Sequence, residues 1–149
     1  MNITKCKWIC VVFAWLVGLA MGILLSIYFF DSQSRKAFGI YLDNYLSLEE
    51  NEALDKFKET PPIIAIYAQD RLIKYATSLK ELGVLKKDNY ARIVGIAEAR
   101  KGLLYETVGE NQKSSQCFNN AVEKFKEGNI RTNIDELRLL LNKTRRSRN

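Results

Sequence analysis

The sequence predicts an all-α protein in which one membrane-spanning helix precedes a small bundle of helices. Three observations support this fold class. Residues 8–30 form a run of 23 residues without a charge. After that run, apolar residues recur at steps of three and four, and no stretch alternates apolar and polar residues at a step of two. Glycine and proline residues then divide the chain into segments of helical length.

The uncharged run at 8–30 is long enough to cross a bilayer as a helix. At 1.5 Å per residue it would extend about 35 Å, against a hydrocarbon core of about 30 Å. The alternative is a cleaved signal peptide, for which Lys5 and Lys7 would form the positive first region. The run is longer than the apolar region of such a peptide, and residues 27–30 are too bulky for a cleavage site. The sequence therefore favours an uncleaved anchor in the membrane.

Small residues recur at every fourth position of this run, which puts them on one helix face: Ala14, Gly18, Gly22 and Ser26. Such a face lets a second helix approach closely, so we expect the anchor to pack against another membrane protein or a second copy of this chain. The alternative is that small residues are common in membrane helices and that their register is accidental.

The net charge of +6 is confined to the two ends of the chain. Of the 23 basic residues, two precede the run and four lie in a basic tail, so residues 31–142 hold 17, equal to the 17 acidic residues. A neutral domain offers no surface for nucleic acid, which is therefore not expected as its partner. The tail residues are Lys143, Arg145, Arg146 and Arg148.

The positive charges beside the run bear on its orientation. Lys5 and Lys7 precede it, and Arg35 and Lys36 follow it, so the count is equal on the two sides. The short amino-terminal tail then favours a single-pass protein with a cytoplasmic amino terminus and a domain on the periplasmic or extracytoplasmic side.

The residue inventory argues against an enzyme. The chain has no histidine, so it lacks the commonest general base and the commonest metal ligand. Cys117 has no imidazole that could activate it, and Cys6 and Cys10 lie at the start of the anchor. We expect no catalytic residues, no metal and no cofactor.

The boundaries of the domain follow from helix breakers. The sequence predicts a short tail at 1–7, the anchor at 8–30, a membrane-proximal helical segment at 31–60, a helical domain at 61–142 and a basic tail at 143–149. Within 31–60, the part from 51 to 59 is expected to be solvated, because Leu54 and Phe57 are its only apolar pair.

Four helices are predicted in the domain. Thr60 is expected to cap the first, which begins at Pro61 and ends at Gly83. Its predicted buried stripe is Ile64, Ala68, Leu72, Tyr75, Leu79 and Leu82. The next two are predicted over 88–108, stopped by Gly109, and over 111–127, stopped by Gly128. The last is predicted over 133–145, where Asn133 and Glu136 have the spacing of a capping box.

Residues 95–128 resemble a tetratricopeptide repeat, a pair of antiparallel helices of about 34 residues. The residues that match its pattern in order are Gly102, Tyr105, Gly109, Ser114, Phe118 and Ala121. The chain departs from the pattern at Glu98, Lys101 and Lys126, where the family has an aromatic residue, a leucine and a proline. The resemblance implies close packing of the two helices, with Tyr105 and Phe118 between them. A second repeat at 61–82 is left open.

Two functions remain open at this point. The resemblance implies a concave groove that receives a peptide or helix of another protein. Together with the anchor, this suggests a membrane-anchored interaction module, an accessory or scaffolding subunit of a larger membrane complex. The alternative is that the basic tail contacts a membrane surface or nucleic acid, although a loose, solubilising end explains the tail more simply.

Overall fold

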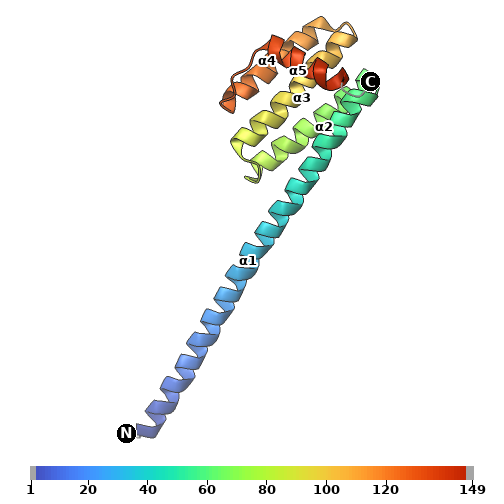
Figure 1. Cartoon of the computed structure of the whole chain (residues 1–149). Helices are drawn as coiled ribbons and strands as arrows, with labels where there is room; N and C mark the ends of the chain where they lie inside the picture. Colours follow the sequence, from blue (N-terminus) through green and yellow to red (C-terminus); the bar gives the residue numbers. More distant parts are fainter. Residues whose placement is uncertain (1–2, 147–149) are drawn as a thin grey trace. The chain divides into compact units, whose positions relative to one another are not determined.

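The computed structural model describes the backbone of residues 3–146 and the side chains of residues 15–34 and 36–145. Residues 3–146 form helices and connecting turns without a strand, so the predicted all-α class is confirmed. In chain order the helices are α1 (Ile3–Glu59), α2 (Pro62–Glu81), α3 (Lys87–Thr107), α4 (Asn111–Glu127) and α5 (Ile134–Arg146), labelled in Figure 1.

The chain divides into two units, which we call the amino-terminal unit (Met1–Tyr41) and the helical unit (Leu42–Asn149); α1 contributes residues to both. In the amino-terminal unit, every side chain from residue 15 to residue 30 is exposed. Among the described residues, one helix, α1, is long and apolar enough to cross a membrane by its length and composition.

The helical unit is organised around α3, which contacts both α2 and α4, while α5 contacts α3 and α4 (Figure 1). The last turns of α1 join α2 through a buried hydrogen bond, in which Nε2 of Gln69 donates to the carbonyl oxygen of Ala53 at 2.6 Å. Two groups of buried residues form the core. The first is centred on Leu46, Leu72, Leu79, Tyr90, Ile93 and Val94, and the second on Phe57, Leu103, Leu104, Phe118, Phe125, Leu137 and Leu141.

Most predicted helix ends agree with the structure because they depend on local chemistry. Gly83 and Gly109 follow α2 and α3 with φ of 70° and 80°, a left-handed conformation that glycine adopts without steric cost. The capping box of α5 is formed in both directions. Oδ1 of Asn133 accepts from the backbone N–H of Glu136 at 2.9 Å, and the backbone N–H of Asn133 donates to Oε2 of Glu136 at 3.3 Å.

The predicted cap at Thr60 is wrong. Its hydroxyl donates to the carbonyl oxygen of Lys56 at 2.7 Å, so it closes the end of α1 and forms no side-chain cap on α2. Threonine commonly bonds to the carbonyl four residues back. Pro61 and Pro62 carry no N–H, so the start of α2 has fewer donors that need a cap.

The predicted buried stripe of α2 is confirmed at Ala68, Leu72 and Leu79, but its other members are not fully buried. Ile64 and Leu82 are 51% and 67% exposed, whereas the buried residues are Ala65, Ala68, Gln69, Leu72, Ala76 and Leu79. The alanines explain the difference, because short side chains let neighbouring helices approach closely. The face rich in alanine is therefore the one that is buried, and the larger residues beside it remain outside.

The prediction that residues 51–59 are solvated is wrong. Ala53 is 1% exposed and Phe57 is fully buried, because the last turns of α1 pack on α2 and the Phe57 ring enters the second core group. The helical unit accordingly begins at Leu42. Leu42 lies within the membrane-proximal segment 31–60, which the sequence analysis separates from the helical domain at Pro61 and Pro62.

Candidate functional site

The predicted helix pair is closely packed at Gly102. A Cβ atom on Gly102 would lie 2.9 Å from the ring of Phe118, closer than side chains tolerate. Phe118 and Ala121 are fully buried on the facing side of α4. The missing side chain at Gly102 therefore makes the space that the aromatic ring occupies.

The other members of the predicted pair lie toward the turn. Gly109 makes the turn between α3 and α4, and Ser114 is buried in the first turns of α4. Tyr105 is half-buried, and Nζ of Lys113 lies 5.6 Å from its ring centroid. Phe118 thus fills the space between α3 and α4. Tyr105 lies at the edge of that space, near Lys113.

A polar cluster occupies two of the three positions at which the chain departs from the repeat pattern, Glu98 and Lys101. Nζ of Lys101 lies 2.7 Å from Oδ1 of Asp70 and 3.3 Å from Oε1 of Glu98. Since Asp70 belongs to α2, these contacts tie α2 to α3. Burial acts to lower the pKa of Lys101, but the hydrogen bond to Asp70 and the charges of both carboxylates raise it overall. An ion pair therefore stands where the repeat would have apolar side chains.

Cys117 lies beside this cluster as a buried free thiol. Burial, reinforced by the charge of Glu98, raises the pKa of Cys117 to about 11, although the charge of Lys101 acts the other way. The thiol is therefore protonated at neutral pH and is a weak nucleophile.

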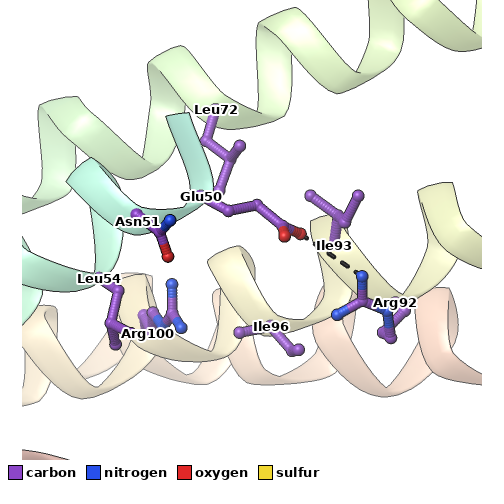
Figure 2. Close-up of a pocket in the computed structure, with 8 residues that line it drawn as sticks. All are labelled: Glu50, Asn51, Leu54, Leu72, Arg92, Ile93, Ile96 and Arg100. Carbon is purple, nitrogen blue, oxygen red and sulfur yellow. Dashed lines mark ion pairs between the residues drawn. The ribbon is translucent and has the colours of Figure 1, made fainter. Parts of the chain in front are cut away.

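A second polar feature is a cavity of about 120 Å³ between the last turns of α1 and the helices α2 and α3 (Figure 2). Polar side chains from two helices line it: Glu50 and Asn51 of α1, and Arg92 and Arg100 of α3. Leu54, Leu72, Ile93 and Ile96 complete the wall. The cavity thus combines an apolar wall with groups that donate and accept hydrogen bonds.

The two arginines of the cavity differ in their surroundings. Nη2 of Arg92 lies 3.6 Å from Oε1 of Glu50, an ion pair longer than a hydrogen bond. Nε of Arg100 is buried and has no hydrogen-bond partner among the described residues. Burial lowers the pKa of Arg100 to about 10, against the opposing charge of Glu50, so its guanidinium is still cationic at neutral pH.

The predicted anchor face is described in part. Gly18, Gly22 and Ser26 are exposed on α1, and a Cβ atom added at either glycine would meet nothing within 4 Å. The side chain of Ala14 lies outside the described residues. The three described positions thus leave room for a second helix.

Part of the predicted basic tail belongs to α5. The helix runs through Lys143 and Arg145, and the Arg145 guanidinium lies 5.9 Å from the ring centroid of Phe57. The side chain of Arg146 and the whole of Arg148 lie outside the described residues. Arg145 therefore lies against the core. This differs from the expectation that the basic tail is a loose, solubilising end.

The cavity was missed by the sequence reasoning, although the sequence carries a faint signal for it. Arg92, Ile96 and Arg100 recur at four-residue steps, so two cations follow one another along a helix whose neighbouring residues are small or apolar. Such a pair more often marks a solvated face, and only the packing of α1 against α3 encloses it.

No protein-family model matches the chain, and no match is found among curated proteins or among solved structures. The likeness of residues 95–128 to a tetratricopeptide repeat therefore remains a prediction from the residues themselves.

Proposed function

We propose that this chain is a membrane-anchored protein–protein interaction module that serves as an accessory or scaffolding subunit of a larger membrane complex. The observation that carries the proposal is the large apolar surface that both units leave exposed. Exposed apolar surface of this extent is typical of contact with lipid or with another protein.

In the amino-terminal unit, this surface is the side chains of residues 15–30, with Trp15 72% and Phe30 77% exposed. Lipid would cover these side chains if α1 spans a membrane once. A cytoplasmic amino terminus would place the helical unit on the extracytoplasmic side. The face of Gly18, Gly22 and Ser26 would then be available for a neighbouring membrane helix.

In the helical unit, the corresponding surface lies on the first turns of α2, where Ile63, Ile64 and Tyr67 are 79%, 51% and 70% exposed. These three large side chains lie outside because α2 buries its alanines. A helix or peptide of a partner protein would cover them, in keeping with the tetratricopeptide-like packing proposed for α3 and α4.

The experiment is chemical crosslinking of the full-length chain in native membranes, followed by identification of the captured proteins. In the double variant Gly18→Ile and Gly22→Ile, the yield of product crosslinked through the anchor should fall at least tenfold. The added side chains would hold the backbones of the two helices apart. Expression and membrane insertion should be unchanged, since isoleucine favours the bilayer.

The matched control is Ala20→Ile, which adds an isoleucine on the opposite side of the helix and should retain the wild-type product. A second variant, Tyr67→Asp, tests the surface on α2 in the same assay. If no protein is captured by the wild-type chain, or if all variants capture it equally, the proposal is wrong.

A further inference from the structure

The cavity between α1 and α3 concentrates hydrogen-bond donors that the protein itself does not use fully. Arg92 and Arg100 stand two turns apart on α3 and both line it, and the side-chain amide of Asn51 lines it from α1 (Figure 2). A guanidinium has five N–H donors arranged as a planar fork, which suits the oxygens of a carboxylate or phosphate group.

Arg100 is the residue whose surroundings most need explanation. Its Nε is buried without a hydrogen-bond partner among the described residues, and its guanidinium lies 5.8 Å from the ring centroid of Phe57. A buried cationic donor without an acceptor is costly, so native proteins normally provide one from the chain, from water or from a ligand. Here the described residues provide none at Nε.

The charges of the cavity also favour an anion. Two guanidinium groups face a single carboxylate, that of Glu50, which leaves one positive charge in excess among the residues of the lining. Glu50 approaches Arg92 at 3.6 Å and makes no hydrogen bond to Arg100. In Figure 2 its carboxylate points toward Arg92, so the charge of Arg100 is offset only from a distance.

The cavity has room for a small ligand group. Its volume of about 120 Å³ is enough for ordered water molecules or one small oxyanion group. The apolar wall of Leu72, Ile93 and Ile96 lowers the local dielectric and so strengthens a charge-assisted hydrogen bond there.

We propose that this cavity is an oxyanion-binding site, in which Arg100 binds a phosphate or carboxylate group and the charge of Arg92 attracts it. Arg100 supplies the buried donor, and Arg92 supplies the more exposed cation at the other end. Glu50 orients Arg92 and excludes a second anion by its own charge. The site is independent of membrane anchoring, because every residue that forms it belongs to the helical unit.

The test uses the full-length chain in detergent micelles and follows the Nε–H signals of its arginines by NMR. Sodium phosphate, sodium acetate and sodium chloride are titrated at matched ionic strength, and the Arg100 signal is identified by its loss in Arg100→Lys. We expect a saturable shift of that signal with phosphate or acetate and none with chloride. Saturation with only one of the two anions identifies which oxyanion the site takes.

Two variants and a second measurement complete the test. Arg92→Gln should weaken the binding at least tenfold, while Arg131→Gln, which removes an exposed arginine from the turn before α5, should leave it unchanged. Phosphate or acetate should raise the melting temperature of the wild-type chain and of Arg131→Gln, as measured by circular dichroism. The rise should be smaller in Arg92→Gln, in line with its weaker binding. Equal responses to all three salts, or equal binding by both variants, would overturn the proposal and leave a cavity that holds water.

Discussion

At the scale of single residues, the contact between Gly102 and Phe118 determines how closely α3 and α4 pack. A Cβ atom at Gly102 would lie 2.9 Å from the ring of Phe118, and that ring is fully buried. Phe118→Ala should therefore cost about 3 to 5 kcal/mol of unfolding free energy, and Gly102→Ala should cost about 1 to 3 kcal/mol by overpacking. Urea unfolding of the full-length chain, followed by circular dichroism, measures both.

The double variant separates this contact from general helix effects. Once Phe118 is alanine, the added methyl group at Gly102 no longer meets the ring. Gly102→Ala should then be neutral or stabilising by about 0.5 to 1 kcal/mol, as alanine is in an unobstructed helix. The same cost in both backgrounds would contradict the contact.

The chemistry of Cys117 is also decided at this scale. Burial raises its pKa to about 11 from an ordinary value of 9.0, so at pH 8 the folded chain should hold roughly 100-fold less thiolate than the unfolded chain. Alkylation by iodoacetamide, in a chain with Cys6→Ser and Cys10→Ser, should accelerate by at least tenfold when denaturant is added.

The same pKa has a consequence for stability. Between about pH 9 and pH 11 the unfolded thiol ionises while the folded thiol keeps its proton, so the folded state binds more protons and stability should fall as the pH rises. Cys117→Ala should remove this part of the pH dependence. Equal alkylation of the folded and unfolded chains would show that the thiol is not protected.

At the scale of elements, the last turns of α1 are part of the core of the helical unit. Phe57 is fully buried, with the guanidinium groups of Arg100 and Arg145 at 5.8 and 5.9 Å from its ring centroid. We expect Phe57→Ala to cost about 3 to 5 kcal/mol of unfolding free energy, since it removes a large ring and part of the contact with both arginines.

Leu48→Ala is the matched control for this prediction. Leu48 lies on the same helix but is 65% exposed, so its truncation should change stability by less than about 0.5 kcal/mol. Thermal unfolding by circular dichroism compares the two variants. A shift at Phe57 no larger than that at Leu48 would mean that α1 does not contribute to the core.

Predictability also differs between elements. The ends of α2 and α3 follow from glycine stops and the start of α5 from a capping box, which act within one or two turns of the chain. The buried face of α2 could not be predicted in the same way, because Ile64 and Ala65 are neighbours and only the helices packed on α2 decide which of them is enclosed. The cavity arginines escaped prediction for the same reason.

At the scale of the whole molecule, the proposed anchor makes a direct prediction about membrane association. Thirteen of the 23 residues at 8–30 are leucine, isoleucine, valine or phenylalanine, which favour insertion by roughly 4 to 8 kcal/mol. The full-length chain should stay in the membrane pellet after washing with alkaline carbonate, as immunoblotting of the pellet and the supernatant would show.

A double variant provides the contrast. Val17→Arg with Leu19→Arg places two charges at the middle of the run, at about 2.5 to 3.5 kcal/mol each, which offsets most of the gain. This variant should move to the supernatant. Release of the wild-type chain by carbonate, or recovery of a shorter chain that begins near Arg35, would contradict the anchor.

The sequence by itself determined the helical class, the positions of most helix ends and the presence of one long apolar helix. Each depends on residues close together in the chain, such as Gly83, Gly109 and the pair Asn133 and Glu136. Tertiary structure decided that Phe57 is core, that α2 buries its alanines, and that Arg92 and Arg100 face a cavity. These features depend on burial, which a side chain acquires from residues distant in sequence.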